Sequence, residues 1–293
     1  MSREGGGFSP WRRLWARDVN SAPAIVWHYT TADALIKIMT YKKLWASDIH
    51  YLNDASENTR MKELLLRRIT DRFGSGAQPR LTQLQSEIRF WDSEMYRTFV
   101  ACFSEEGDSL SQWRAYGTGY GYAIGFSSKQ LAALCDRPTP LVQASQGLPH
   151  LVFGGVDYVR EDGENEGIIV DEFIDALLQS LDKTPNLLPY STIAFRHRAP
   201  FVKDAAFSTE AEWRLAGTID STDVTGLKHR PGRSHLIPYI ALELEADLGD
   251  LIVEIRVGPG PNRDLDVKAV KDFAKAQHLN VEVTPTAIPF RNW

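Results

Sequence analysis

The sequence predicts an α+β fold in which helices pack on a mostly antiparallel sheet. Short runs rich in β-branched and aromatic residues recur between residues 25 and 283, and segments with apolar residues at helical spacing separate them at irregular intervals. A strict alternation of strands and helices would instead indicate a parallel sheet. The 293 residues, 43% of them hydrophobic, are enough for one large domain with insertions or for two modest domains.

The first third of the chain combines two strand-like runs with several helices. Residues 25–29 form an apolar run typical of a buried strand. Thr31 follows as a helix cap, and Leu35, Ile38 and Met39 recur at the spacing of one helical face. The elements expected next are a short strand at 44–46, a polar loop at 48–54, a helix capped by Asp54 or Ser56, a break at 74–79 and a helix at about 81–95.

Strand-like runs predominate in the rest of the chain. Strands are expected at 98–104, 120–126, 151–158, 212–217, 236–244, 251–257 and 279–283. Helices are expected at 110–116, 127–134, 167–198 and 264–277, the third of them interrupted near Pro185 and Pro189. These patterns predict an N-terminal tail at 1–22 and a single domain at 23–293, with helical insertions near 55–97 and 167–200.

The bulk composition narrows the classes of function. A net charge of −5 argues against a broad electrostatic grip on nucleic acid. Cys102 and Cys135 are the only cysteines, which excludes a disulfide framework or a multi-cysteine zinc site, and Cys102 lies in an apolar run where a thiol is usually inert. The histidines show no metal-binding spacing, so no metal is expected. Without an apolar run of 18 residues or a signal-peptide pattern, we expect a cytoplasmic protein with no membrane contact.

Two carboxylates spaced by one residue, Glu210 and Glu212, directly precede an apolar strand-like run. In an extended strand, positions two apart point to the same face at a separation of about 6.6 Å. Both carboxylates would then face one space. That separation lies within the range of about 6.5–9.5 Å seen in inverting glycosidases, but those carboxylates flank the scissile bond from opposite sides, which disfavours the glycosidase reading. The alternative is a solvated edge strand, with Arg214 as a same-face partner of Glu212.

Other polar and aromatic residues are candidates, each with a structural alternative. His28 ends the first apolar run, where a lone histidine is often a satisfied structural residue. Trp113 and Tyr116 have helical spacing, which suits either core packing or a ligand platform. Asn53 precedes a helix and can form a turn, while Ser104 follows a buried strand and can line a pocket or belong to a loop.

Six blocks of the sequence, taken together and in order, carry a family resemblance. They are WHYT, LWASDIHYLNDASE, VACFSEEGDSLSQWRAYG, YAIGF, FSTEAEWRL and IRVGPG. This set resembles a large bacterial family known only as a domain of unknown function, from about Trp27 to about Gly260. That family in turn resembles ADP-ribosyltransferases, which bind NAD in a split β-sheet core. The resemblance implies such a core here, with helical insertions.

The resemblance also implies catalytic roles for individual residues. His28 would match the first-strand residue that holds the nicotinamide ribose, with Thr30 assisting. Glu212 would match the late glutamate that bonds the ribose 2′-hydroxyl and stabilises the positive charge formed as nicotinamide leaves. Glu210 would match the residue that orients the acceptor, and it could take a proton from the incoming nucleophile.

An aromatic residue that stacks on nicotinamide is implied as well, and Tyr116 is preferred to Trp113 and Tyr122. The other NAD-contacting residues implied are Tyr29, Ser104 and Asn53. NAD would be the substrate, without a metal, and the acceptor would be a protein, a nucleic acid or water. Related bacterial transferases include toxins and phage-defence effectors, so an antitoxin would be a further partner. Two alternatives are a non-catalytic module of the same fold that binds a nucleotide or protein, and a purely structural partner of a toxin or defence complex.

Overall fold

The computed structural model describes residues 19–53, 59–74, 79–90, 96–116, 120–135, 151–160, 167–183, 195–221, 226–232, 234–244 and 248–289. These residues form a mixed α/β fold with an open, mostly antiparallel sheet and several helices. Most of the expected tail at 1–22, and both expected helix caps, Asp54 and Ser56, lie outside the described residues.

Three strands lie side by side and connect the rest of the large sheet. Strands β3 (Tyr96–Ser104) and β8 (Glu212–Asp220) pair antiparallel along their full lengths, with Ser104 opposite Glu212. Strand β5 (Leu151–Gly155) pairs with the other edge of β8. Because β8 has a neighbour on each edge, Glu212 begins an interior strand and not a solvated edge strand.

The sheet divides into two arms at the second edge of β3. The first arm contains β1 (Ile25–Thr30), β4 (Tyr122–Ser127), β11 (Ile252–Val257) and β12 (Glu282–Pro285); the second contains β2 (Lys43–Asp48), β10 (Leu236–Glu243) and β9 (Lys228–Pro231). Strand β1 pairs with β3 where Trp27 lies opposite Ser104, whereas β2 pairs with Phe99 and Val100. Residues 101–103 lie between these pairings, and there the two arms separate. Within the arms, only the β11–β12 pair is parallel among the described strands.

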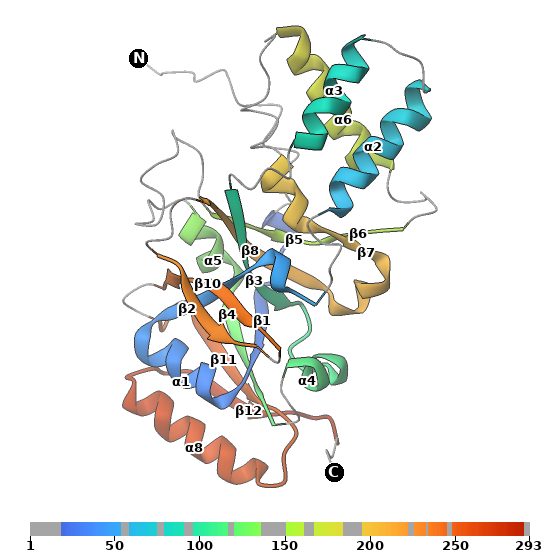
Figure 1. Ribbon diagram of the computed structural model, residues 1–293. Coiled ribbons are helices and arrows are strands. Elements are labelled where there is room, and N and C mark those ends of the chain that lie inside the picture. The colour runs from blue at the N-terminus through green and yellow to red at the C-terminus, as the bar shows by residue number, and fades with distance from the viewer. Residues whose placement is uncertain are drawn as a thin grey trace, which may run out of the picture.

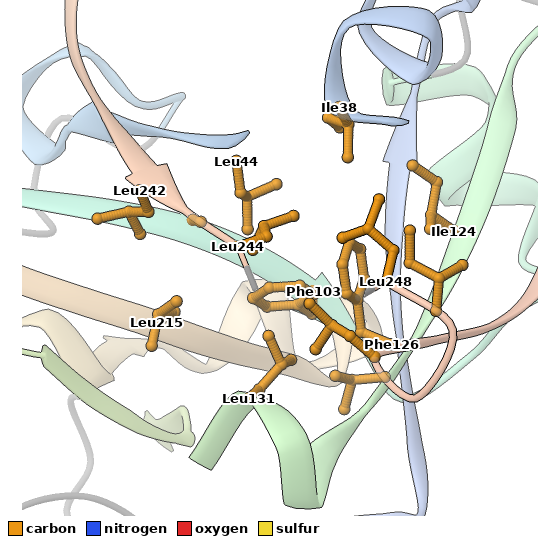
Figure 2. Close-up of a cluster of buried hydrophobic side chains, with 14 of the residues drawn as sticks. Ile38, Leu44, Phe103, Ile124, Phe126, Leu131, Leu215, Leu242, Leu244 and Leu248 are labelled. Carbon is orange, nitrogen blue, oxygen red and sulfur yellow. The ribbon is translucent and has the colours of Figure 1, made fainter. Parts of the chain in front are cut away.

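The main hydrophobic core lies between this sheet and three helices, α1 (Ala32–Tyr41), α5 (Ser128–Cys135) and α8 (Arg263–Ala276). Figure 2 shows Ile38 of α1, Phe103 of β3 and Leu131 of α5 in this core. Helix α1 confirms the local prediction: the Thr31 hydroxyl accepts a hydrogen bond from the Ala34 amide at 3.4 Å. Its three periodic apolar residues are buried.

A second hydrophobic core joins helices from both predicted insertions. Figure 1 shows α2 (Arg60–Phe73), α3 (Pro79–Phe90) and α6 (Gly167–Lys183) gathered at one end of the molecule, beyond the large sheet. Their apolar faces share this core with a separate parallel pair of strands, β6 (Asp157–Val159) and β7 (Val202–Asp204). Helical segments distant in sequence therefore pack together because each has an apolar face to bury.

The short elements depart most from the sequence prediction. The expected strand at 151–158 is two strands, β5 and β6, which belong to different sheets. Glu210 ends a 3-10 helix, η6 (Ala205–Glu210), and Ala211 then adopts a left-handed conformation with φ 43°, so the expected extended arrangement of residues 210–212 is wrong. The remaining short elements are η2 (Val19–Ser21), η3 (Ile49–Tyr51), η5 (Ala199–Phe201) and helix α4 (Leu110–Tyr116).

Candidate functional site

A cavity of about 480 Å³ lies where the two arms separate from β3. That volume is typical of small-molecule sites. Its wall takes residues from β1, β3, β2, β9, α1 and α4, and from the turn that precedes β8. The sheet topology explains the cavity. Strands β1 and β2 diverge from the same edge of β3 and leave a wedge-shaped space between them, which side chains from both arms line.

His28 of β1 lies in this wedge. Its Nδ1 atom is 2.9 Å from the carbonyl oxygen of Cys102 on β3, a residue between the two pairings of that edge. A carbonyl can only accept, so Nδ1 carries the proton and Nε2 is an acceptor in the neutral ring. Burial lowers the pKa of His28 and outweighs the opposing effect of the carbonyl bond, so the ring is neutral at pH 7.

Glu212 is held by two cations. Arg214 donates from Nε to Oε1 and from Nη2 to Oε2, both at 2.8 Å, and Lys203 Nζ lies 3.1 Å from Oε2. Burial alone would raise the pKa of Glu212, but Arg214 and then Lys203, with a hydrogen bond from Cys102, lower it to about 2. The carboxylate is therefore ionised at any physiological pH. The same-face partnership of Glu212 and Arg214, considered from the sequence, is present.

Lys203 connects Glu210 to Glu212 by bonding to both carboxylates; the two glutamates do not share a strand face. The Lys203 ammonium is 2.7 Å from Glu210 Oε2, and Phe207 of the intervening turn lies 4.7 Å from it in a cation–π contact. Lys203 is buried, whereas about a quarter (23%) of the Glu210 side chain is exposed. Both carboxylates line the cavity. The sequence prediction of one common space is thus met, although the backbone achieves it by a turn.

Tyr116 of α4 supplies an aromatic wall beside the carboxylates. Burial raises the pKa of its phenol, and the nearby charges of Glu210, Cys102 and Glu212 raise it further. The hydroxyl therefore stays protonated and can act as a hydrogen-bond donor. Trp113 is fully buried in a different cluster, donates from Nε1 to Asp108 at 2.8 Å and does not line the cavity. It is thus a core residue.

The other predicted NAD-contacting residues fall into two groups. Tyr29, Thr30 and Ser104 line the cavity. The Tyr29 hydroxyl also donates to the carbonyl of Glu106 at 2.7 Å, and Ser104 Oγ donates to the Glu210 carbonyl at 2.8 Å, so both order loops beside the cavity. Asn53 is exposed and lies outside the lining, although its neighbour Leu52 contributes to it. The preference for Asn53 as a ligand contact has no support in this placement.

Three lining or contacting residues carried no usable signal in the sequence. Lys203 lies in a three-residue strand, too short to show a period, and Arg230 lies in a strand that periodicity did not predict. Cys102 was expected to be an inert core thiol, yet it is partly exposed and lines the cavity. Each is brought to the site by pairing with a distant segment, which local patterns do not record.

Comparison with known proteins gives one match. A family model described as "Protein of unknown function (DUF2971)" matches residues 112–215, about a third of the chain, which include Tyr116, Glu210 and Glu212. No curated protein and no solved structure matches. No group of three or more potential metal-binding side chains occurs among the residues that the structure describes. None of the described helices is long and apolar enough to cross a membrane.

Proposed function

We propose that the chain is an NAD-dependent ADP-ribosyltransferase, which cleaves the nicotinamide N-glycosidic bond of NAD and transfers ADP-ribose to a macromolecular acceptor. The observation that supports this most is the common cavity at the division of the sheet. It brings His28 of the first strand to the same space as Glu210 and Glu212, which lie 182 and 184 residues later in the sequence. These are the positions that the resemblance to ADP-ribosyltransferases implies.

The chemistry requires charge stabilisation and one proton transfer. The bond between the ribose C1′ atom and the nicotinamide nitrogen breaks, and the electron pair leaves with neutral nicotinamide. Positive charge then develops on the ribose ring, where fixed anions and dipoles are most effective. A nucleophilic atom of the acceptor forms the new bond to C1′, and its proton passes to a base.

The contacts of the two carboxylates suit different roles. Glu212 is fixed and ionised, and its oxygens retain lone pairs beyond those that Arg214 and Lys203 use, so it can accept from a ribose hydroxyl. Its charge is largely compensated by those cations. Among the described residues the Glu210 carboxylate accepts one hydrogen bond, from Lys203 to Oε2, so its other oxygen Oε1 is the better proton acceptor. The neutral His28 ring and the Tyr116 hydroxyl would orient the substrate.

The test is transfer from NAD labelled in its ADP-ribose part, with purified protein and cell extract, together with direct measurement of nicotinamide. We expect Glu210→Gln to reduce transfer about 10²-fold or more, as for the loss of a general base. Glu243→Gln is the matched control, because Glu243 also pairs with a lysine, Lys43, at 2.6 Å but lies outside the cavity lining. Unchanged transfer by the Glu210 variant would refute the proposed role.

A second candidate is a non-catalytic module of the same fold that binds a nucleotide or a protein. The charge-compensated state of Glu212 favours it, because an ion pair of this kind can serve the fold alone. Calorimetry with NAD distinguishes the two candidates: heat of binding without nicotinamide release supports the module. A toxin or phage-defence role, an antitoxin partner and a cytoplasmic location rest on the resemblance and the composition, and they stay proposals.

A further inference from the structure

Arg230 lies at the part of the cavity formed by the second arm. It belongs to β9, and its side chain reaches across β10 to β2, where Nη2 donates to Ser47 Oγ at 3.0 Å. Ser47 and Arg230 both line the cavity, and so does Trp45 of β2. A long cationic side chain is thus directed from an edge strand toward the cavity wall.

The charge of Arg230 is not balanced by a carboxylate within the described part of the chain. The other cations in or beside the cavity are paired: Lys37, which lines it, with Asp33 at 2.7 Å, and Lys203 and Arg214, which lie behind its wall, with Glu210 and Glu212. Among the described residues Arg230 donates one hydrogen bond, to Ser47, although a guanidinium has five donors. Partial burial of an uncompensated charge is unfavourable, and an anionic ligand would relieve it.

The position of Arg230 fits an elongated ligand. Its partner Ser47 lies opposite Val100, while Glu212 lies opposite Ser104. The two levels are four positions apart on β3, which corresponds to about 13 Å along the strand. At the Ser104 level Lys203 and Arg214 balance the two glutamates, so no net charge remains there, whereas the guanidinium at the Val100 level attracts a negative group. The cavity is therefore electrostatically asymmetric along β3.

We infer that Arg230, held by Ser47, binds the diphosphate of a dinucleotide whose glycosidic end faces Glu210 and Glu212. The dinucleotide identity rests on the proposed function. The preference of the cavity for an anion beside β2 and β9 rests on Arg230 alone. It can be tested by binding measurements without any catalytic turnover. Planar guanidinium groups bind phosphate oxygens in two-point contacts that an ammonium cannot reproduce.

Calorimetry of the full chain with four probes tests the inference: NAD, ADP-ribose, ADP and nicotinamide riboside, which has no phosphate. We expect Arg230→Gln to weaken the binding of NAD, ADP-ribose and ADP about tenfold or more, which is the usual effect of losing a charged hydrogen bond. The affinities of Arg230→Lys for these three probes should fall between those of Arg230→Gln and wild type. The affinity for nicotinamide riboside should be the same in all three proteins. Lys228→Gln is the control, since Lys228 lies on the same strand, is exposed and does not line the cavity.

Thermal unfolding of each variant is the control that checks whether the fold is kept. Wild-type affinity of Arg230→Gln for ADP-ribose and ADP would overturn the inference, as would equal weakening by Lys228→Gln or an absence of binding of every phosphate-containing probe to the wild-type chain. The two proposals fail separately. Arg230-dependent binding of NAD without nicotinamide release supports the inference and contradicts the transferase. Nicotinamide release with a KM for NAD that Arg230→Gln does not change supports the transferase and contradicts the inference.

Discussion

Replacing Glu212 by Gln should cost stability as well as function. The glutamate side chain is 5% exposed, and it holds the fully buried Arg214 guanidinium and the buried Lys203 ammonium. Glutamine has nearly the same shape but no charge, so Arg214 would lose its ion pair with Glu212, and Lys203 would lose one of its two carboxylate partners. Removing one partner of a buried ion pair typically destabilises a protein by about 3–5 kcal/mol.

The pKa of Glu212 gives an independent magnitude. A fall from the usual 4.5 to about 2 on folding, at 1.36 kcal/mol for each tenfold change, corresponds to about 3 kcal/mol at pH 7. Because the folded pKa is the lower one, this stabilisation is complete above pH 4.5 and is lost as the pH falls toward 2. About 2 kcal/mol of it should disappear between pH 7 and pH 3.

Urea unfolding of wild type and Glu212→Gln at several pH values between 7 and 3 measures both effects. We expect the variant to be less stable by about 3 kcal/mol at pH 7, and the difference to shrink steadily below pH 4.5. Glu243→Gln, which removes an exposed carboxylate, should change stability little. A Glu212 variant within about 0.5 kcal/mol of wild type at pH 7, or a difference that does not depend on pH, would refute the reasoning.

Two further substitutions test packing and hydrogen bonding elsewhere in the fold. Gly258→Ala should lower stability by about 1–3 kcal/mol in thermal unfolding, because the new Cβ would lie 2.7 Å from the Gly121 carbonyl oxygen, which belongs to a backbone that cannot easily move; an unchanged Tm would contradict that packing. Asp48→Asn should cost about 1–3 kcal/mol in urea unfolding at pH 7, because the buried Asp48 carboxylate accepts from Arg97 at 2.7 Å and from the His50 amide at 3.0 Å. Burial opposes ionisation of Asp48, but these bonds lower its pKa, so the cost should diminish as the pH falls below the unfolded value of 3.8; a cost that grows in acid would contradict the assignment.

The elements with several concurrent local signals were predicted well. The segment from residue 25 to residue 41 combines an apolar run, a capping threonine and three apolar residues at helical spacing, and the structure has a strand and a capped helix there. Such signals depend on neighbouring residues alone, and tertiary contacts then reinforce them. Strands of three or four residues, such as β7 and β9, are too short to carry a period and were missed.

Pairing partners were the second source of error. An alternating apolar pattern reports which side of a strand is buried but not which strand lies beside it. The run at 151–158 was therefore taken as one strand, although its first part pairs with β8 and its last part with β7 of the separate small sheet. The left-handed turn at Ala211 was missed for a related reason, because alanine gives no local signal for a positive φ.

The sequence by itself determined that His28 belongs to a buried strand and that Glu212 and Arg214 share one face of another, because a period of two fixes side-chain direction within a strand. Only the tertiary structure decided that Lys203 would join the two glutamates and that Arg230 would face the same cavity. Those placements follow from ladders between segments far apart in the chain, and from the separation of two strands along one edge of β3. Hydrogen-bond pairing and burial act across space, whereas sequence patterns record only neighbours along the chain.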